Sequence, residues 1–210
     1  MRSRKSIVWV AIACAGVAWA ESSPAPKERP GEESFFIDLP QHGVAVTHSG
    51  EMKLGAGPPG IALFQEPAIR NGLAILTKLR NAKGEVIGFG SELEVFPAGA
   101  DLVTQDVTWE TDWTLVIPGR GTLFLHEQER SGELGTKVLG PTLKTGEPWV
   151  GDWTTTSTVG PRPDGKGVIA GGSGEFTGAT GWFEETIRLT KYTKEGAMFG
   201  TVELKVHRER

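Results

Sequence analysis

Alternating apolar and polar residues are the main pattern of the chain between residues 73 and 207. A period of two places neighbouring side chains on opposite faces of a half-buried β-strand. The pattern is clearest in residues 107–117, where one face carries Val107, Trp109, Thr111, Trp113, Leu115 and Ile117. Similar runs cover residues 73–79, 87–95, 122–128, 149–155, 182–192 and 198–207. The pattern therefore predicts an all-β protein.

Turn-forming sequences separate these runs. Asn81–Gly84, Pro118–Gly121 and Lys194–Gly196 are typical of hairpin turns. Shorter apolar runs at 35–39 and 44–47 predict two further strands, and residues 131–148 predict a loop long enough to cover the mouth of a barrel. Seven or eight strands with turns at this spacing favour a barrel or a sandwich.

A glycine-rich stretch stands out from the rest of the chain. Residues 171–181 contain five glycines around a single phenylalanine, Phe176, and lie between two β-like runs. Glycine is used where the backbone needs a positive φ, a bulge or a close approach. The stretch predicts a corner between two strands, with Phe176 filling the space that the glycines leave.

The sequence GGSGEFTGATG at 171–181 resembles a signature of the allene oxide cyclase and dirigent-like β-barrels. The resemblance is specific over these eleven residues and is supported more weakly by the strand-rich chain from residue 32 to residue 208. It implies a single eight-stranded antiparallel barrel with an apolar cavity, often assembled as a homotrimer. No catalytic residue of that family matches a position outside the glycine stretch, so none is transferred.

The first 34 residues differ from the remainder. Residues 1–20 combine a basic start, an apolar run and the small-residue site Ala18-Trp19-Ala20, which predicts a cleaved signal peptide. The apolar run is too short for a membrane anchor, and Cys14 leaves lipoprotein processing as an alternative. Residues 21–34 are charged and proline-rich, which predicts a disordered spacer. The barrel domain is then expected at 35–210.

Composition narrows the classes of partner. Without residues 1–20 the chain has 19 Lys and Arg against 26 Asp and Glu, a formal charge of −7. An acidic chain without a basic patch argues against binding to nucleic acid or to an anionic membrane. The predicted mature chain has no cysteine, so its stability must come from its core. We expect a secreted or periplasmic protein.

Two carboxylates share a strand face with apolar residues. Glu127 is in register with Leu123 and Leu125, and Glu185 is in register with Phe183 and Ile187. If these faces point into a barrel, burial would raise both pKa values and suit proton transfer to a bound ligand. The alternative is a pair of solvated side chains at strand ends, bonded to Arg130 or Arg188.

Three further residues complete the candidate site. Ser91 and Thr111 are polar members of otherwise apolar faces, and Trp113 belongs to a set of large aromatic residues that either line a cavity or fill the core. The four histidines have no close spacing on one element, so no metal site is expected. The glycines lack the spacing of a phosphate-binding loop, and no cofactor is expected.

Three functions fit these observations. The first is a barrel that binds a lipophilic or aromatic small molecule without chemical change. The second, which the resemblance implies, is a cyclase, isomerase or dirigent-like enzyme that acts by holding a reactive substrate in one conformation. The third is a structural barrel filled by its own side chains. Function depends on sites and not on folds, so the sequence leaves these alternatives open.

Overall fold

A computed structural model of the chain describes residues 31–39, 43–47 and 71–209, with the backbone alone for 43–47. The predicted signal peptide at 1–20 and most of the predicted spacer lie outside the described residues. Among the described residues, no helix has both the length and the apolar composition needed to span a bilayer.

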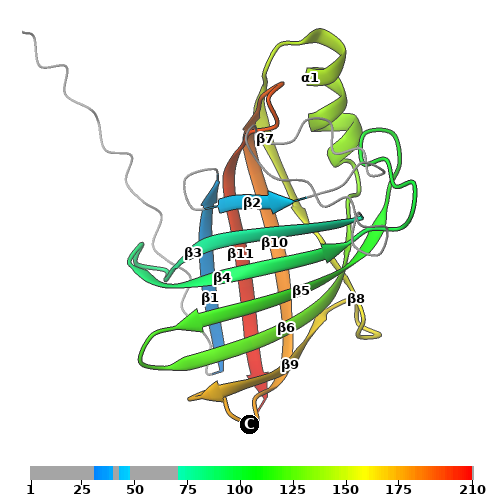
Figure 1. The fold of residues 1–210 in the computed structure, drawn as a ribbon. Coiled ribbons are helices and arrows are strands. Elements are labelled where there is room, and N and C mark those ends of the chain that lie inside the picture. The colour runs from blue at the N-terminus through cyan, green and yellow to red at the C-terminus, as the bar shows by residue number, and fades with distance from the viewer. Residues whose placement is uncertain (1–30, 40–42, 48–70, 210) are drawn as a thin grey trace, which may run out of the picture.

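The chain forms one closed eight-stranded antiparallel β-barrel (Figure 1). The ring runs β1–β11–β10–β9–β6–β5–β4–β3 and closes where Phe36 of β1 lies opposite Arg80 of β3. Its strands are β1 (Glu32–Leu39), β3 (Gly72–Arg80), β4 (Val86–Val95), β5 (Thr108–Ile117), β6 (Gly121–Arg130), β9 (Gly167–Gly174), β10 (Thr180–Tyr192) and β11 (Met198–Glu209). The all-β prediction and the barrel are confirmed.

Three further strands pair with strands of the ring. β2 (Gly43–Thr47) pairs with β3, β7 (Trp149–Thr156) pairs with β10, and β8 (Thr158–Gly160) pairs with β6. β9 joins β6 to β10 only near one end of the barrel, because it meets β10 at Trp182 and Phe183 alone. Between β7 and β8 the chain therefore crosses from β10 to β6, and it does so at Ser157.

Two sequence predictions need correction, one of a boundary and one of a loop. β1 begins at Glu32, so residues 32–34 of the predicted spacer belong to the barrel. The predicted loop at 131–148 contains a π-helical turn, η1 (Gly135–Leu139), and a short helix, α1 (Gly140–Thr145). Two turns are too short to show a 3.6-residue pattern. Their contact with the barrel comes mainly from Val138 and Leu139, which are fully buried.

The glycine-rich stretch is the predicted corner. It contains the end of β9, a turn and the start of β10, without a helix. Phe176 is buried in the barrel core. A Cβ on Gly172 would lie 2.5 Å from the Cβ of Phe176, so a larger residue cannot replace this glycine without displacing the phenylalanine. The prediction that Phe176 fills the space left by the glycines is confirmed.

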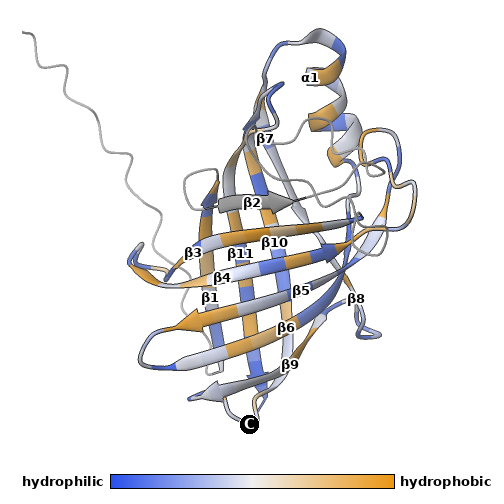
Figure 2. Cartoon of the chain, viewed as in Figure 1, coloured by the Kyte–Doolittle hydropathy of each residue, from blue (hydrophilic) through white to orange (hydrophobic). Residues whose placement is uncertain are grey.

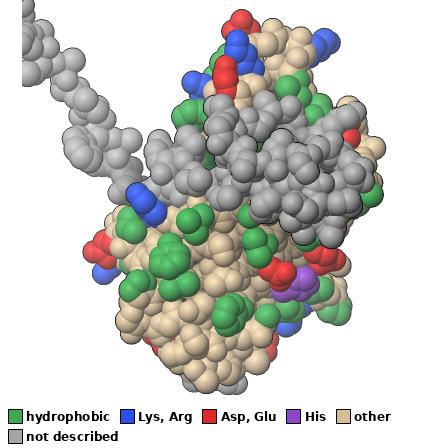
Figure 3. Space-filling view, viewed as in Figure 1, with side chains coloured by type: hydrophobic (Ala, Val, Ile, Leu, Met, Phe, Trp, Pro, Cys, Tyr) green, Lys and Arg blue, Asp and Glu red, His purple; other side chains and the backbone are tan. Residues whose placement is uncertain are grey.

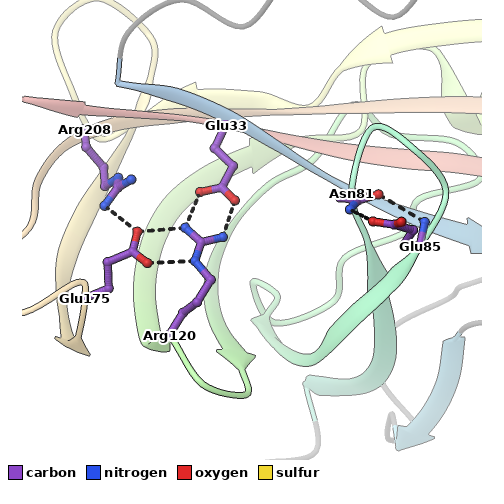
Figure 4. Close-up of polar contacts among 6 residues, drawn as sticks. All are labelled: Glu33, Asn81, Glu85, Arg120, Glu175 and Arg208. Atoms are coloured by element: carbon purple, nitrogen blue, oxygen red, sulfur yellow. Dashed lines mark hydrogen bonds and ion pairs between the residues drawn. The ribbon is translucent and has the colours of Figure 1, made fainter.

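Charged side chains surround the corner at this end of the barrel (Figure 4). Arg120 binds Glu33 of β1 and, through two bonds of 2.8 Å, Glu175 of the corner. Arg208 also contacts Glu175, and both guanidinium groups lie just over 5 Å from the centre of the Phe176 ring. We call this the corner end of the barrel; α1 marks the helical end (Figure 1).

Two apolar clusters fill the interior. The cluster at the corner end includes Phe35, Leu115, Leu123, Phe176 and Phe183. The cluster at the helical end includes Phe96, Trp109, Leu139, Trp153 and Tyr192. Hydrophobic and strongly hydrophilic positions alternate along the strands (Figure 2), and on β10 the inward-facing Glu185 lies between Phe183 of the first cluster and Leu189 of the second. This acidic position between the two clusters marks the candidate site.

Candidate functional site: a buried glutamate cluster

Glu127 and Glu185 both point into the barrel, as the alternation of β6 and β10 predicts. The exposed fractions of their side chains are 0 % and 2 %. The alternative of solvated ends paired with arginine is wrong, because Arg130 instead binds Asp106 and Arg188 binds Asp152. Both glutamates lie between the two apolar clusters.

Three further glutamates join them, and the sequence analysis did not single these out. Glu92 and Glu94 come from β4, and Glu129 comes from β6. We call the set Glu92, Glu94, Glu127, Glu129 and Glu185 the glutamate cluster. No member is more than 8 % exposed.

Strand pairing explains why these residues meet. Thr111 of β5 lies between Glu94 of β4 and Glu127 of β6 in one row across the sheet. In neighbouring rows, Glu92 pairs with Trp113 and Glu129 pairs with Trp109. Residues two apart on a strand face the same side, so all of these side chains point into the barrel.

Ser91 is the one candidate that the structure does not bring to the cluster. It lies between Glu92 and Gly90 on β4 and shares the outer face with Phe89, Leu93 and Val95, which are exposed. A strand with acids on one face and apolar residues on the other is expected to bury the apolar face, and β4 does the reverse. Hydrophobic side chains are visible on this outer side of the barrel (Figure 3).

Hydrogen bonds from β5 fix three of the carboxyl groups. The Thr111 hydroxyl donates to Glu129 Oε2 at 2.8 Å, and the Trp113 indole donates to Glu185 Oε2 at 3.0 Å. Trp109 donates in the same way to Glu94 Oε1 at 3.2 Å. The predicted orienting residues Thr111 and Trp113 thus contact the cluster, and Trp109 is an additional one.

The crossing between β7 and β8 supplies a fourth contact. The Thr158 hydroxyl donates to Glu127 Oε2 and accepts a bond of 2.6 Å from the backbone N–H of Glu185. Ser157 holds the crossing in place, since its N–H donates to the Glu185 carbonyl and its carbonyl accepts from the Arg130 N–H. The side chain of Thr158 therefore joins Glu127 to the strand that carries Glu185.

The glutamate cluster buries five carboxyl groups together, and none of the described residues places a positively charged side chain beside them. Within the described part of the chain, no ion pair includes any of its five members. Burial raises the pKa of all five carboxyls above the usual value near 4.5. Neighbouring carboxylate charges raise the pKa of Glu92 and Glu185 further, whereas the Thr111 hydroxyl partly offsets the effect of burial on Glu129. The folded state favours neutral carboxyls or a bound positive charge here.

Two carboxyl oxygens in the cluster lack a donor. Among the described residues, no group donates a hydrogen bond to Glu127 Oε1 or to Glu94 Oε2, although both atoms are buried. Buried polar atoms are normally satisfied, because leaving one without a partner costs about 1–3 kcal/mol. These two oxygens can therefore accept a hydrogen bond from a protonated neighbour in the cluster or from a bound ligand, or they can coordinate a cation.

The other chemical groups of the described region are less suited to be a site. His126 lies on the outer surface between Glu110 and Asp112, in contact with solvent. His207 stacks on Trp182. A groove bordered by Asp38, Arg188 and Phe199 lies on the outside of β1, β10 and β11. Of these groups only His207 has a buried atom without a hydrogen bond, Nδ1, and it stands alone, whereas the glutamate cluster brings five buried carboxyls together.

Comparison with known proteins adds no assignment: no protein-family model matches the chain, and no curated protein matches its sequence. The barrel is compatible with the resemblance drawn from residues 171–181, but the fold alone carries no activity.

Proposed function

We propose that the protein binds a small molecule inside the barrel, with an apolar body and at least one hydrogen-bond donor. The observation that carries the proposal is the glutamate cluster between two apolar clusters. Pockets for small molecules are mostly apolar with a few placed polar groups, and such groups give orientation and specificity.

The two free acceptor atoms define the chemistry of the ligand. Glu127 Oε1 and Glu94 Oε2 accept but receive nothing from the described residues. A ligand hydroxyl or amine would satisfy them, and an aromatic body would contact the neighbouring Trp109, Trp113 and Trp153. The lipophilic or aromatic ligand expected from the sequence is thereby refined to one with a polar, donating end.

A filled structural barrel is the competing account. The corner end is indeed filled, by the apolar cluster around Phe176. Five buried carboxyls are unexpected in a barrel that only fills itself, because burying a carboxyl costs free energy unless it is fully bonded, and two oxygens of the cluster have no donor among the described residues. This cost favours a binding function over a purely structural one.

Catalysis is a second candidate. The resemblance to the allene oxide cyclase and dirigent-like barrels suggests a cyclase or isomerase that holds its substrate in one conformation, with Glu127 and Glu185 as the reactive groups. Their burial beside Trp113 and Thr111 supports this candidate, since side chains locked by such contacts position a substrate. Turnover of a bound ligand is the property that distinguishes it from the first candidate.

Native mass spectrometry of the protein purified from its own host tests the proposal. We expect a non-covalent organic mass that is lost on denaturation. Added aminoanthracene, an aromatic amine, should also bind in the presence of a chelator, and Glu127→Gln should bind it more weakly than Glu184→Gln. Glu184 is the adjacent, half-buried residue of β10 that faces the other side. Absence of both the organic mass and probe binding would contradict the proposal and favour the filled barrel.

Location and assembly remain proposals from the sequence. We infer export to the periplasm or the medium from residues 1–20, with no role at a membrane or on nucleic acid. A homotrimer, implied by the resemblance, would have the exposed apolar side chains Phe89 and Leu93 of β4 available for contact between subunits.

A further inference from the structure

Three members of the glutamate cluster converge from three strands of the barrel. Glu92 of β4, Glu129 of β6 and Glu185 of β10 each offer one carboxylate oxygen, and these oxygens lie within 4.8 Å of one another. Like charges at this separation repel strongly in a buried site. Their convergence therefore needs protons or a cation between them.

The spacing fits a divalent cation with oxygen ligands. Calcium–oxygen distances of about 2.3–2.6 Å place opposite ligands about 5 Å apart, and neighbouring ligands lie closer. The set has carboxylates and no histidine or cysteine, which suits hard cations such as Ca²⁺, Mg²⁺ and Mn²⁺ and disfavours zinc.

A second observation points to a ligand at the same place. Glu127 Oε1 is buried, has no donor among the described residues, and belongs to a side chain within hydrogen-bonding reach of Glu185. Two carboxyl groups can face each other in this way when they share either a proton or a cation. No Lys, Arg or His of the described region forms an ion pair with either group.

We propose that Glu92, Glu129 and Glu185 form a binding site for one divalent cation inside the barrel, with Glu127 beside it. The ligands of the cation differ from the two acceptors proposed for the small molecule, although both proposals draw on the unsatisfied Glu127 Oε1, so separate experiments test them. It reverses the expectation from the sequence, in which scattered histidines indicated no metal site.

Hydrogen bonds from neighbouring side chains orient two of the proposed ligands. Thr111 donates to Oε2 of Glu129 and Trp113 donates to Oε2 of Glu185, so each carboxylate is held through one of its two oxygens. Hydrogen bonds of this kind orient metal ligands and reduce the freedom they lose on binding. Thr111 and Trp113 are thus positioning residues for the cation site.

Terbium luminescence tests the site directly. Tb³⁺ replaces Ca²⁺ at oxygen sites and emits when a nearby tryptophan is excited, and the Trp113 indole is bonded to a proposed ligand. We expect saturable Tb³⁺ emission under tryptophan excitation, one ion per chain, with displacement by Ca²⁺. Glu129→Gln and Glu185→Gln should each weaken binding at least about tenfold, whereas Glu184→Gln should bind like the unmodified protein.

The outcomes separate the alternatives. No sensitised emission from the unmodified protein, which requires no variant to fold, would overturn the cation site. Equal binding in Glu129→Gln, Glu185→Gln and Glu184→Gln would overturn it as well and would place the ion at surface acids. Binding of aminoanthracene in chelator is measured separately, so loss of the cation site leaves the proposed function standing, and the reverse also holds.

Discussion

The Trp113 indole donates a hydrogen bond to Glu185 across the interior of the barrel, over a donor–acceptor distance of 3.0 Å. The two residues are 72 positions apart in sequence and belong to β5 and β10, which are not neighbours in the sheet. The contact therefore spans the barrel and connects the corner-end apolar cluster, which contains Trp113, to the glutamate cluster.

Replacing Trp113 with phenylalanine should destabilise the protein by about 2–4 kcal/mol, because the change leaves a cavity and removes the donor to Glu185. Urea unfolding measures the difference. Trp182→Phe is the matched control, since Trp182 is half-buried and stacks on His207 at the outer face. If Trp113→Phe lowers the free energy of unfolding no more than this control does, the hydrogen bond from Trp113 to Glu185 does not stabilise the fold measurably.

Removing one acid from the cluster should stabilise the metal-free protein. At about pH 8 in chelator, Glu185→Gln should raise the free energy of unfolding by about 1–3 kcal/mol, since it removes a charge that is costly to bury. Glu184→Gln should change it by less than about 0.5 kcal/mol. Addition of Ca²⁺ should reverse the order, because the unmodified cluster binds the cation more tightly than the Glu185→Gln cluster and gains more stability from it. Chemical unfolding with and without Ca²⁺ decides the point.

The stability of the metal-free protein should fall as the pH rises. Burial holds the pKa of the cluster carboxyls above their value in the unfolded chain, near 4.5. The folded state then binds more protons than the unfolded state above that pH, so the contribution of the cluster to stability is greatest below about pH 4.5 and is lost as the pH rises through the raised pKa values.

The surface acids Glu175 and Asp106 affect stability in a different pH range. The pKa of Glu175 is lowered by its hydrogen bond to Arg120, and that of Asp106 by its bond to Arg130. Their contribution is lost only as the pH falls below their unfolded values, and solvent screens it because both are exposed. Thermal unfolding in chelator at about pH 5 and about pH 8 should therefore give the higher midpoint at pH 5. A higher midpoint at pH 8 would argue against buried, uncompensated acids.

The corner should be sensitive at Gly172 and Phe176. Phe176→Ala should cost about 3–5 kcal/mol through cavity formation, and Gly172→Ala about 1–3 kcal/mol because its new Cβ would overlap Phe176. Thr180→Ala, an exposed change at the start of β10, should cost less than about 1 kcal/mol. Urea unfolding measures the free energy of unfolding of the three variants. Equal losses in all three would contradict the close contact between Gly172 and Phe176.

Alternation predicted some strand faces and could not predict others. On β5, β6 and β10 the apolar face lies inside, so Thr111, Trp113, Glu127 and Glu185 were found from their neighbours. On β4 the same rule selects the outer face, and it directs attention to Ser91 in place of Glu92 and Glu94. A period of two defines two faces without saying which is buried. Continuing the β6 pattern by two residues would have found Glu129.

The glycine corner was predictable because it is local. Five glycines around Phe176 allow positive φ angles and close backbone contacts within eleven residues, whatever the remainder of the chain does. The convergence of Glu92, Glu129 and Glu185 is not local, since it depends on the order and register of strands far apart in sequence. Similarly, the crossing at Ser157 and Thr158 follows from β7 and β8 pairing with different partners, which no short pattern indicates.

A carbon-13 NMR titration of the glutamate carboxyls in chelator would show whether the cluster is buried without counter-charge. We expect Glu92, Glu94, Glu127, Glu129 and Glu185 to titrate above the usual value near 4.5, and added Ca²⁺ to lower the apparent pKa of the three proposed ligands. Ordinary titration of all five, unchanged by Ca²⁺, would mean that solvent reaches the cluster. Both the small-molecule proposal and the cation site would then lose their basis.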